Sequence, residues 1–287
     1  MDYVKPAEVV KNMIESGVAK AALPVRDLLI RGFLSGALLA FATSLAVTAT
    51  VQTGIPLVGA VVFPVGFVII VLLGLELVTG SFALVPLGCL EGRTPISTML
   101  SNLAWVFFGN LLGSLFYGAL LYICLTMMGA NAPDAVAAKL IAIAEAKTAG
   151  YAKFGMAGAV TVFVKAILCN WMVTLGVVLA MTSRSAAGKI AASWLPIFIF
   201  FAQGFEHSVV NMFVIPTGML LGAKVSISDW WLWNQIPVTL GNFAGGFLFT
   251  GLALYLTLKP RTDASVTTMS HSPIKKSLLL EKESATP

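Results

Sequence analysis

The chain has 287 residues, of which 58% are hydrophobic and only 11% are Asp, Glu, Lys or Arg. A typical soluble domain is roughly 45–50% apolar and about 25% charged, so this composition excludes a soluble enzyme, a disordered chain and a nucleic-acid-binding domain. The formal net charge is +5, but the basic residues lie outside the apolar runs and are therefore interpreted as determinants of membrane topology. The sequence predicts an integral membrane protein.

Residues 1–27 contain no uninterrupted apolar core, so we expect no cleavable signal peptide there. Apolar residues recur at helical spacing in this segment, with charged residues on the opposite face: Val9, Val10, Met13, Ile14 and Val18. This pattern predicts an amphipathic helix lying on the membrane surface, and a mobile tail is the alternative.

Six apolar stretches follow, at about Leu28–Val51, Ile55–Leu90, Thr98–Met128, Ala157–Thr182, Ile190–Leu221 and Ile236–Leu258. Since about 20 residues cross a bilayer, they predict six transmembrane helices. The second and fifth stretches are longer and are interrupted by polar and small residues, at Gly74–Ser81 and Gln203–Asn211. A carboxylate at that depth is costly and usually functional. Both stretches are therefore predicted to be broken helices around a polar site.

The basic residues predict the orientation of the chain. With the N-terminus inside, the outer side carries only Lys139, Lys147, Lys153 and Lys224, and Lys165 lies within the fourth stretch. Cytoplasmic loops are enriched in Lys and Arg, so both termini are predicted to be cytoplasmic. The charged, Ser/Thr-rich segment 259–287 is predicted to be a disordered tail. The cysteines Cys89, Cys124 and Cys169 have unrelated spacings and predict neither a disulfide framework nor a metal cluster.

The two halves of the chain match each other at a nearly constant offset. The matched pairs are Gly74-x-Glu76 with Gly204-x-Glu206, Pro86-Leu87-Gly88 with Pro216-Thr217-Gly218, and Gly109-Asn110 with Gly241-Asn242. We predict two three-helix repeats, 28–128 and 157–258, joined by an outer linker at 129–156. Because three is an odd number of crossings, the second repeat must be inverted, and inverted repeats with broken helices place a substrate site near the midplane.

His207 is the candidate for chemistry at the breaks. An unperturbed imidazole titrates near pH 6.5, so it can exchange a proton at working pH. A small anion is expensive in an apolar pore, whereas its protonated acid is neutral and crosses more easily. The alternative is a core histidine that is hydrogen-bonded into helix packing.

The other polar residues at the breaks are assigned supporting roles. Glu206 and Glu76 are expected to fix the broken backbones, and Asn170 and Asn242 either anchor those breaks or bridge neighbouring helices. Thr79 and Ser81 offer donors to an anion. Lys165 is interpreted as a snorkelling lysine or one paired at a subunit boundary, in preference to a pore residue.

Three runs resemble the formate/nitrite transporter family: Gly204-Phe205-Glu206-His207-Ser208-Val209-Val210-Asn211-Met212-Phe213, Leu168-Cys169-Asn170-Trp171-Met172-Val173 and Ile236-Pro237-Val238-Thr239-Leu240-Gly241-Asn242. The resemblance covers about residues 3–258. It implies a homopentamer with an aquaporin-like protomer of six helices and one pore in each. It also implies transport of small monovalent anions such as formate, nitrite or hydrosulfide, with protons as co-substrate.

Carried over by position, the resemblance makes His207 the central pore histidine, faced or oriented by Asn170, with Thr79 in the broken second helix. It assigns Leu77 and Val78 to an outer constriction and Phe67 and Phe200 to an inner one. Structural support of the pore comes from Glu206, Glu76, Asn242 and Asn211. The vestibule lysine is either Lys147, which has the better local context, or Lys153, which has the better spacing.

The sequence therefore predicts proton-linked transport of nitrite and/or formate, with nitrite slightly favoured, by a multi-pass protein of the cell membrane. Its partners are the anion, protons and the lipid bilayer; we expect no nucleic acid, no metal, no cofactor and no enzymatic activity. The alternative is a neutral-solute channel for water or glycerol, which the inverted repeat also permits. Such channels carry paired Asn-Pro-Ala loops and a filter arginine, and this sequence has neither Asn-Pro-Ala nor an intramembrane arginine.

Overall fold

The computed structural model describes residues 2–259, which are almost entirely helical and contain no β-strand. Apart from Lys259, the predicted tail 259–287 lies outside the described residues. The helices in chain order are α1 (Pro6–Ala21), α2 (Val25–Thr53), α3 (Pro56–Val62), α4 (Pro64–Leu72), α5 (Val78–Leu90), α6 (Ile96–Thr126), α7 (Ala135–Lys147), α8 (Ala149–Ala152), α9 (Gly155–Ala180), α10 (Ala186–Ala202), α11 (Ser208–Leu220), α12 (Ile227–Trp230), α13 (Ile236–Gly246) and α14 (Ala253–Leu258).

Four helical segments are long and apolar enough to cross a membrane. They are α2 with 29 residues, α6 with 31, α9 with 26, and a continuous 32-residue segment, Ile227–Leu258, in which π-helical turns join α12, α13 and α14. Large apolar side chains such as Phe41, Phe116 and Leu240 are exposed on these segments. Such exposure suits lipid or a neighbouring subunit, and the predicted all-α membrane fold is confirmed.

The two predicted breaks are present, and they have the same geometry. Helix α4 ends at Leu72 and α5 begins at Val78, whereas α10 ends at Ala202 and α11 begins at Ser208. Gly74 and Gly204 take φ angles of +61° and +64° in the connecting loops, a conformation that favours glycine. The short helices on each side of a break give two half-length pairs among the long helices.

The internal repeat is visible in the hydrogen bonds of two matched asparagines. Asn110 on α6 accepts from the Val78 N–H and donates to the carbonyls of Gly32 and Glu76. Asn242 on α13 accepts from the Ser208 N–H and donates to the carbonyls of Ala166 and Glu206. Each amide therefore holds the start of one half-length helix against two long helices, in both halves of the chain.

Helices α1 and α7 also occupy matched places. The apolar face of α1, which includes Val10 and Met13, packs on Leu84 and Leu87 of α5. Helix α7 packs on α11 in the same way, with Ala144 against Gly218. The amphipathic pattern in residues 1–27 thus serves packing against protein, and the linker 129–156 folds into α7 and α8, helices that the sequence analysis did not predict.

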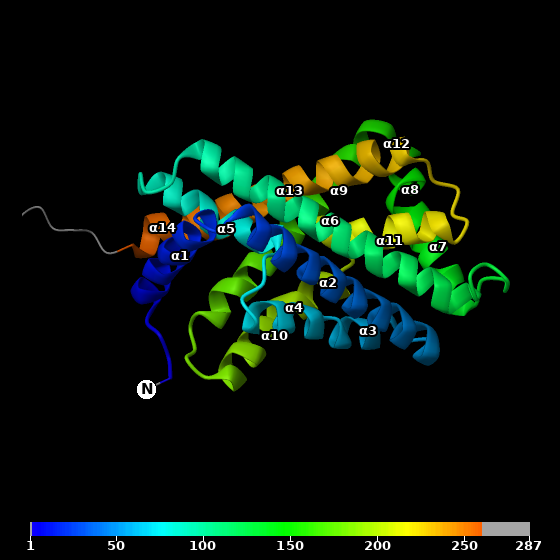
Figure 1. Ribbon diagram of the computed structural model, residues 1–287, viewed down its shortest axis with the longest axis horizontal. Helices are drawn as coiled ribbons and strands as arrows, with labels where there is room; N and C mark the ends of the chain where they lie inside the picture. Colours follow the sequence, from blue (N-terminus) through cyan, green and yellow to red (C-terminus); the bar gives the residue numbers. More distant parts are fainter. Residues whose placement is uncertain (1, 260–287) are drawn as a thin grey trace, which may run out of the picture.

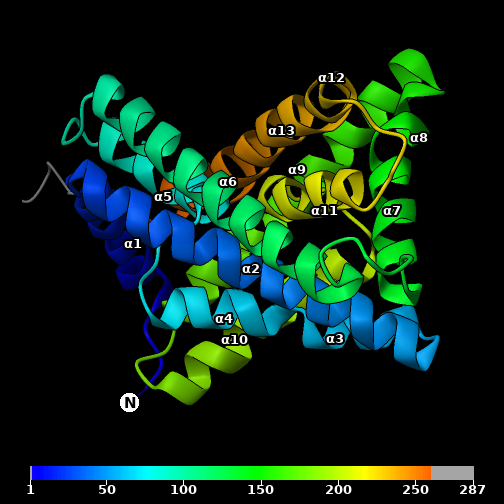
Figure 2. The same cartoon turned by 45° about the vertical axis from the view of Figure 1, so that its right-hand side comes forward.

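The long helices run lengthwise between two ends of the molecule (Figures 1 and 2). Helices α1 and α14 lie together at one end, which we call the α1 end. Helices α7, α8 and α12 lie at the opposite end, which we call the α7 end. The breaks of both halves lie between these ends, so the site that they form has the α1 end on one side and the α7 end on the other.

Candidate functional site

Two buried polar side chains, one from each half of the chain, meet where the breaks face each other. Thr79 lies in the first turn of α5, and His207 is the N-cap residue of α11. Thr79 Oγ1 and His207 Nε2 are 3.1 Å apart, and neither residue is more than 2% exposed. The structure thus brings together the two residues that the sequence analysis assigned to the pore from opposite repeats.

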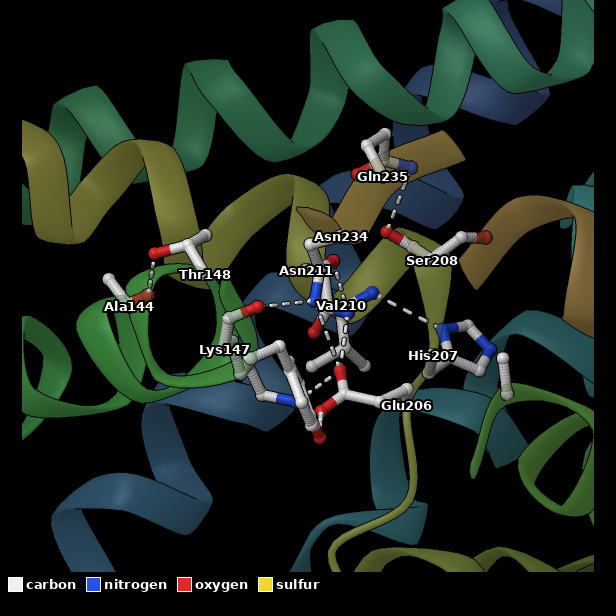
Figure 3. Close-up of polar contacts among 12 residues, drawn as sticks. Ala144, Lys147, Thr148, Glu206, His207, Ser208, Val210, Asn211, Asn234 and Gln235 are labelled. Carbon is white, nitrogen blue, oxygen red and sulfur yellow. Dashed lines mark hydrogen bonds and ion pairs between the residues drawn. The ribbon is translucent and has the colours of Figure 1, made fainter. Parts of the chain in front are cut away.

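The other nitrogen of His207 caps a helix. His207 Nδ1 accepts a hydrogen bond of 3.2 Å from the backbone N–H of Val210 (Figure 3). A ring nitrogen that accepts carries no proton, so the neutral imidazole holds its proton on Nε2 and donates it to Thr79 Oγ1. A second proton on Nδ1 would break the bond to Val210. Protonation of this ring is therefore coupled to the first turn of α11.

Aromatic rings enclose His207 on one side. Phe200 stacks on the imidazole with ring centroids 5.7 Å apart, and Phe63 meets Phe200 edge-on, also at 5.7 Å. Phe63 is fully buried and stacks on Phe201 at 3.9 Å. The sequence analysis missed Phe63, because nothing in the sequence marks it among the 18 phenylalanines. Phe63 and Phe200 form an apolar seal next to the polar contact.

A cavity of about 210 Å³ lies at the α1 end of the site. It is lined by Leu77 and Gly80, which flank Thr79 in the chain, and by Phe67, Lys20 and Lys189. The resemblance assigned Leu77 and Phe67 to constrictions on opposite sides, and in the structure both residues line this one cavity. Of the other two constriction residues, Phe200 stacks on His207, and Val78 is buried with its N–H on Asn110.

A larger cavity, of about 940 Å³, lies at the α7 end. Gly204 and Glu206, just before His207 in the chain, line it together with both candidate vestibule lysines, Lys147 and Lys153. Lys147 Nζ lies 2.7 Å from Glu206 Oε2, so Lys147 is the lysine at the break. Lys165, which the sequence analysis interpreted as a snorkelling or subunit-boundary lysine, also lines this cavity.

Each break carries a buried carboxylate that is paired with a lysine. Glu206 accepts from Lys147, from the Tyr151 hydroxyl at 2.8 Å and from two amides, Asn211 at 2.8 Å and Asn234 at 3.3 Å (Figure 3). A charge in a dry interior is tolerated when it is paired and fully hydrogen-bonded, as it is here.

The matched carboxylate, Glu76, accepts only from Lys20 Nζ among the described residues, at 2.8 and 2.9 Å. The sequence analysis missed Lys20, Tyr151 and Asn234. Lys20 could have been found from the repeat, since it lies in the last turn of α1 as Lys147 lies in the last turn of α7.

Asn170 supports the site without a hydrogen bond to His207. Its Nδ2 donates to the carbonyls of Thr79, at 3.0 Å, and of Asn242, at 2.7 Å. These bonds tie α5 to α13 through α9. Its Oδ1 is buried without a hydrogen-bond partner among the described residues. The structure therefore places Asn170 behind Thr79, where it positions the backbone of that residue. Asn211 lies on α11, the second half-length helix, and Asn242 lies on α13, from which it anchors the start of α11.

The sequence and structure were compared with known proteins. The sequence model described as "Formate/nitrite transporter" matches residues 7–256. A probable formate transporter of Methanothermobacter thermautotrophicus is 38% identical over 272 residues, which cover 89% of this chain and 97% of the relative.

Two solved structures are similar to this fold. An FNT family ion channel has a TM-score of 0.76 at 26% identity, covering 88% of this chain and 99% of that chain. A pentameric formate channel with formate bound has a TM-score of 0.66 at 24% identity, covering 81% and 96%, which is a likeness in fold. Because the family model spans nearly the whole chain, this protein belongs to the formate/nitrite transporter family and is a membrane transporter, not an enzyme.

Proposed function

We propose that this protein carries formate or nitrite, together with a proton, between the two cavities by way of His207. The observation that supports this proposal most directly is the position of the Thr79–His207 contact. Residues next to His207 in the chain line the cavity at the α7 end, and residues next to Thr79 line the cavity at the α1 end. A substrate that moves from one cavity to the other by the shortest route therefore passes this pair. Formate is favoured by the name of the relative from Methanothermobacter thermautotrophicus.

The physical problem along this route is charge. The seal formed by Phe63 and Phe200 is apolar, and a bare carboxylate there has a desolvation cost of several kcal/mol. The protonated acid is neutral, and the single donor at Nε2 of His207 suits an oxygen of such a substrate. Because Nδ1 is occupied by the Val210 N–H, the ring takes on a second proton only when that bond opens. We therefore propose that the proton travels with the anion and that His207 shares it by a hydrogen bond to the substrate.

The basic residues indicate the orientation of the transporter in the membrane, and the exposed apolar faces indicate what surrounds it. We propose that the α1 end faces the cytoplasm of a cell membrane, because the basic residues gather there. The exposed apolar faces of the long helices then contact lipid and neighbouring subunits. A homopentamer is proposed by analogy with the pentameric formate channel of similar fold.

The test uses purified protein in lipid vesicles and measures the uptake of formate and nitrite with and without an inward proton gradient. We expect uptake of at least one anion to rise with the gradient. The variant His207→Asn should lose this response, since asparagine caps a helix well but does not titrate. Ser208→Ala is the matched control, because it lies next to His207 and its hydroxyl has no hydrogen-bond partner among the described residues.

Two outcomes would overturn the proposal. A wild-type response to the gradient in His207→Asn would remove the imidazole from the mechanism. Swelling of wild-type vesicles in glycerol as fast as in ammonium formate would identify a neutral-solute channel.

A further inference from the structure

The cavity at the α7 end holds more positive charge than a monovalent anion needs. Its lining includes four lysines, Lys139 on α7, Lys147 at the end of α7, Lys153 after α8 and Lys165 on α9. Helices α7 and α8 lie at the α7 end of the molecule, and α9 begins against α8 (Figure 2). Glu206 is the one acidic side chain in the lining.

Glu206 neutralises only one of these lysines. It pairs with Lys147 at 2.7 Å, and within residues 2–259 no carboxylate forms an ion pair with Lys139, Lys153 or Lys165. Lys165 Nζ instead lies 5.8 Å from the centroid of the Tyr151 ring, whose hydroxyl donates to Glu206. Three ammonium groups that share one partly enclosed cavity raise the local concentration of anions, and they favour an anion that can neutralise more than one of them.

The size and lining of the cavity indicate an organic ligand. A volume of about 940 Å³ is at the upper end of the usual range for small-molecule sites and greatly exceeds what one formate occupies. Between the lysines the lining is mainly apolar, with Ile143, Phe154 and Ala157, and it includes two hydroxyls, that of Thr161 and that of Tyr151, which donates to Glu206. This combination suits two carboxylates joined by a short carbon chain better than it suits an inorganic ion.

We propose that this cavity is a binding site for a small dicarboxylate, which occupies it without being transported and competes with the monovalent substrate. Passage is blocked because one proton neutralises only one of the two carboxylates. The other charge would still have to cross the apolar seal at Phe63 and Phe200. The competition rests on the proposed function, whereas the binding does not.

Binding is tested directly by calorimetry on the purified full-length protein, with malonate as the probe and propionate as the monovalent control. We expect malonate to bind and propionate to bind at least about tenfold more weakly. Lys139→Gln and Lys165→Gln should each weaken malonate binding roughly fivefold, the effect of losing one partly screened ion pair. Lys224→Gln is the matched control, because Lys224 is an exposed lysine outside this cavity and its replacement removes the same charge.

Competition is tested in the same vesicles by formate uptake in the presence of malonate on either side. We expect inhibition from one side only, with weaker inhibition in Lys139→Gln and Lys165→Gln. Absence of malonate binding, or equal binding in all three lysine variants, would overturn the site. Binding without inhibition would overturn the competition and leave the site standing. If the vesicles take up neither formate nor nitrite, the proposed function fails, while calorimetry still decides whether the site exists.

Discussion

The breaks in the two halves have the same backbone conformation but different polar contacts. In both halves, a glycine with positive φ precedes a glutamate that pairs with a lysine, and an asparagine anchors the next helix. Yet Glu206 has four side-chain partners, whereas Glu76 has Lys20 alone within residues 2–259. The residue that follows the glutamate is His207 in one half and Leu77 in the other. The comparison teaches that the repeat conserves the scaffold, while the chemistry is concentrated in the second half.

One pair of positions explains much of the difference. Asn211 donates to Asn234 Oδ1 at 2.8 Å, and both amides also reach Glu206. The matched residues in the first half are Ser81 and Asn102, and the Ser81 hydroxyl and Asn102 Oδ1 are both buried without a hydrogen-bond partner among the described residues. Serine is shorter than asparagine, so these two atoms stay unpaired in the first half, whereas in the second half Asn211 Oδ1 is the one unpaired side-chain atom of the matched pair among the described residues.

The variants with the largest expected effect test the asparagine anchors that the two halves share. Asn110→Ala and Asn242→Ala each remove three buried hydrogen bonds and leave backbone groups of one break unpaired. Each should destabilise the protein by about 3–5 kcal/mol, because unsatisfied buried groups are costly. The melting temperature of the purified protein in detergent measures this loss. Similar losses in both variants are expected, and a much smaller loss in one of them would show that the scaffold is not equally supported.

An intermediate effect tests the difference between the halves by exchanging their residues. Asn211→Ser introduces the first-half residue and should cost about 1–2 kcal/mol, since Glu206 and Asn234 each lose a donor. Ser81→Asn should stabilise the protein by up to about 1 kcal/mol, because its amide can reach Asn102 Oδ1 and Glu76. Melting temperatures should therefore move in opposite directions. A lower melting temperature for Ser81→Asn would mean that the first half has no room for the larger side chain.

The smallest expected effect concerns the contacts that hold α1 in place. Helix α1 is tied down partly by an exposed ion pair, Glu15–Arg93 at 2.7 Å, and the hydrogen bond from Arg93 lowers the pKa of the Glu15 carboxyl below its ordinary value. The stabilisation from such a lowered pKa is complete above the ordinary value of about 4.3 and is lost as the pH falls through the value in the folded protein. Acid should therefore loosen α1 more than α7.

The measurement is the hydrogen-exchange protection of α1 relative to α7 in the same sample, which removes the intrinsic pH dependence of exchange. Arg93→Gln should lower this ratio already at neutral pH. A ratio that does not change with acid in the wild-type protein would contradict a role for the Glu15–Arg93 pair in holding α1.

The sequence predicted the breaks and the residues at them, because glycines, carboxylates and a histidine within apolar runs can be identified from the sequence without knowledge of the tertiary structure. It did not predict Tyr151 or Asn234, since the partners of Glu206 are chosen by how α7, α8 and α12 approach the break. The place of Lys165 in a cavity was not predicted for a related reason: most of the lining comes from α7, α8 and the start of α9, and α7 and α8 were not predicted. That Leu77 and Phe67 line the same cavity depends on the turn at Gly74, which no periodicity reveals.

The glycines at the contact between α2 and α6 limit how this protein can move. An added Cβ on Gly36 would lie 2.0 Å from the carbonyl oxygen of Asn110, and one on Gly113 would lie 1.9 Å from that of Phe33. A slip of α6 along α2 by one turn would bring Tyr117 to the place of Gly113 or, in the other direction, Trp105 to the place of Gly109, where an added Cβ would lie 2.9 Å from the carbonyl oxygen of Leu29. Helices α2 and α6 are therefore locked in register, and any opening and closing between the cavities must come from the short helices and loops around them.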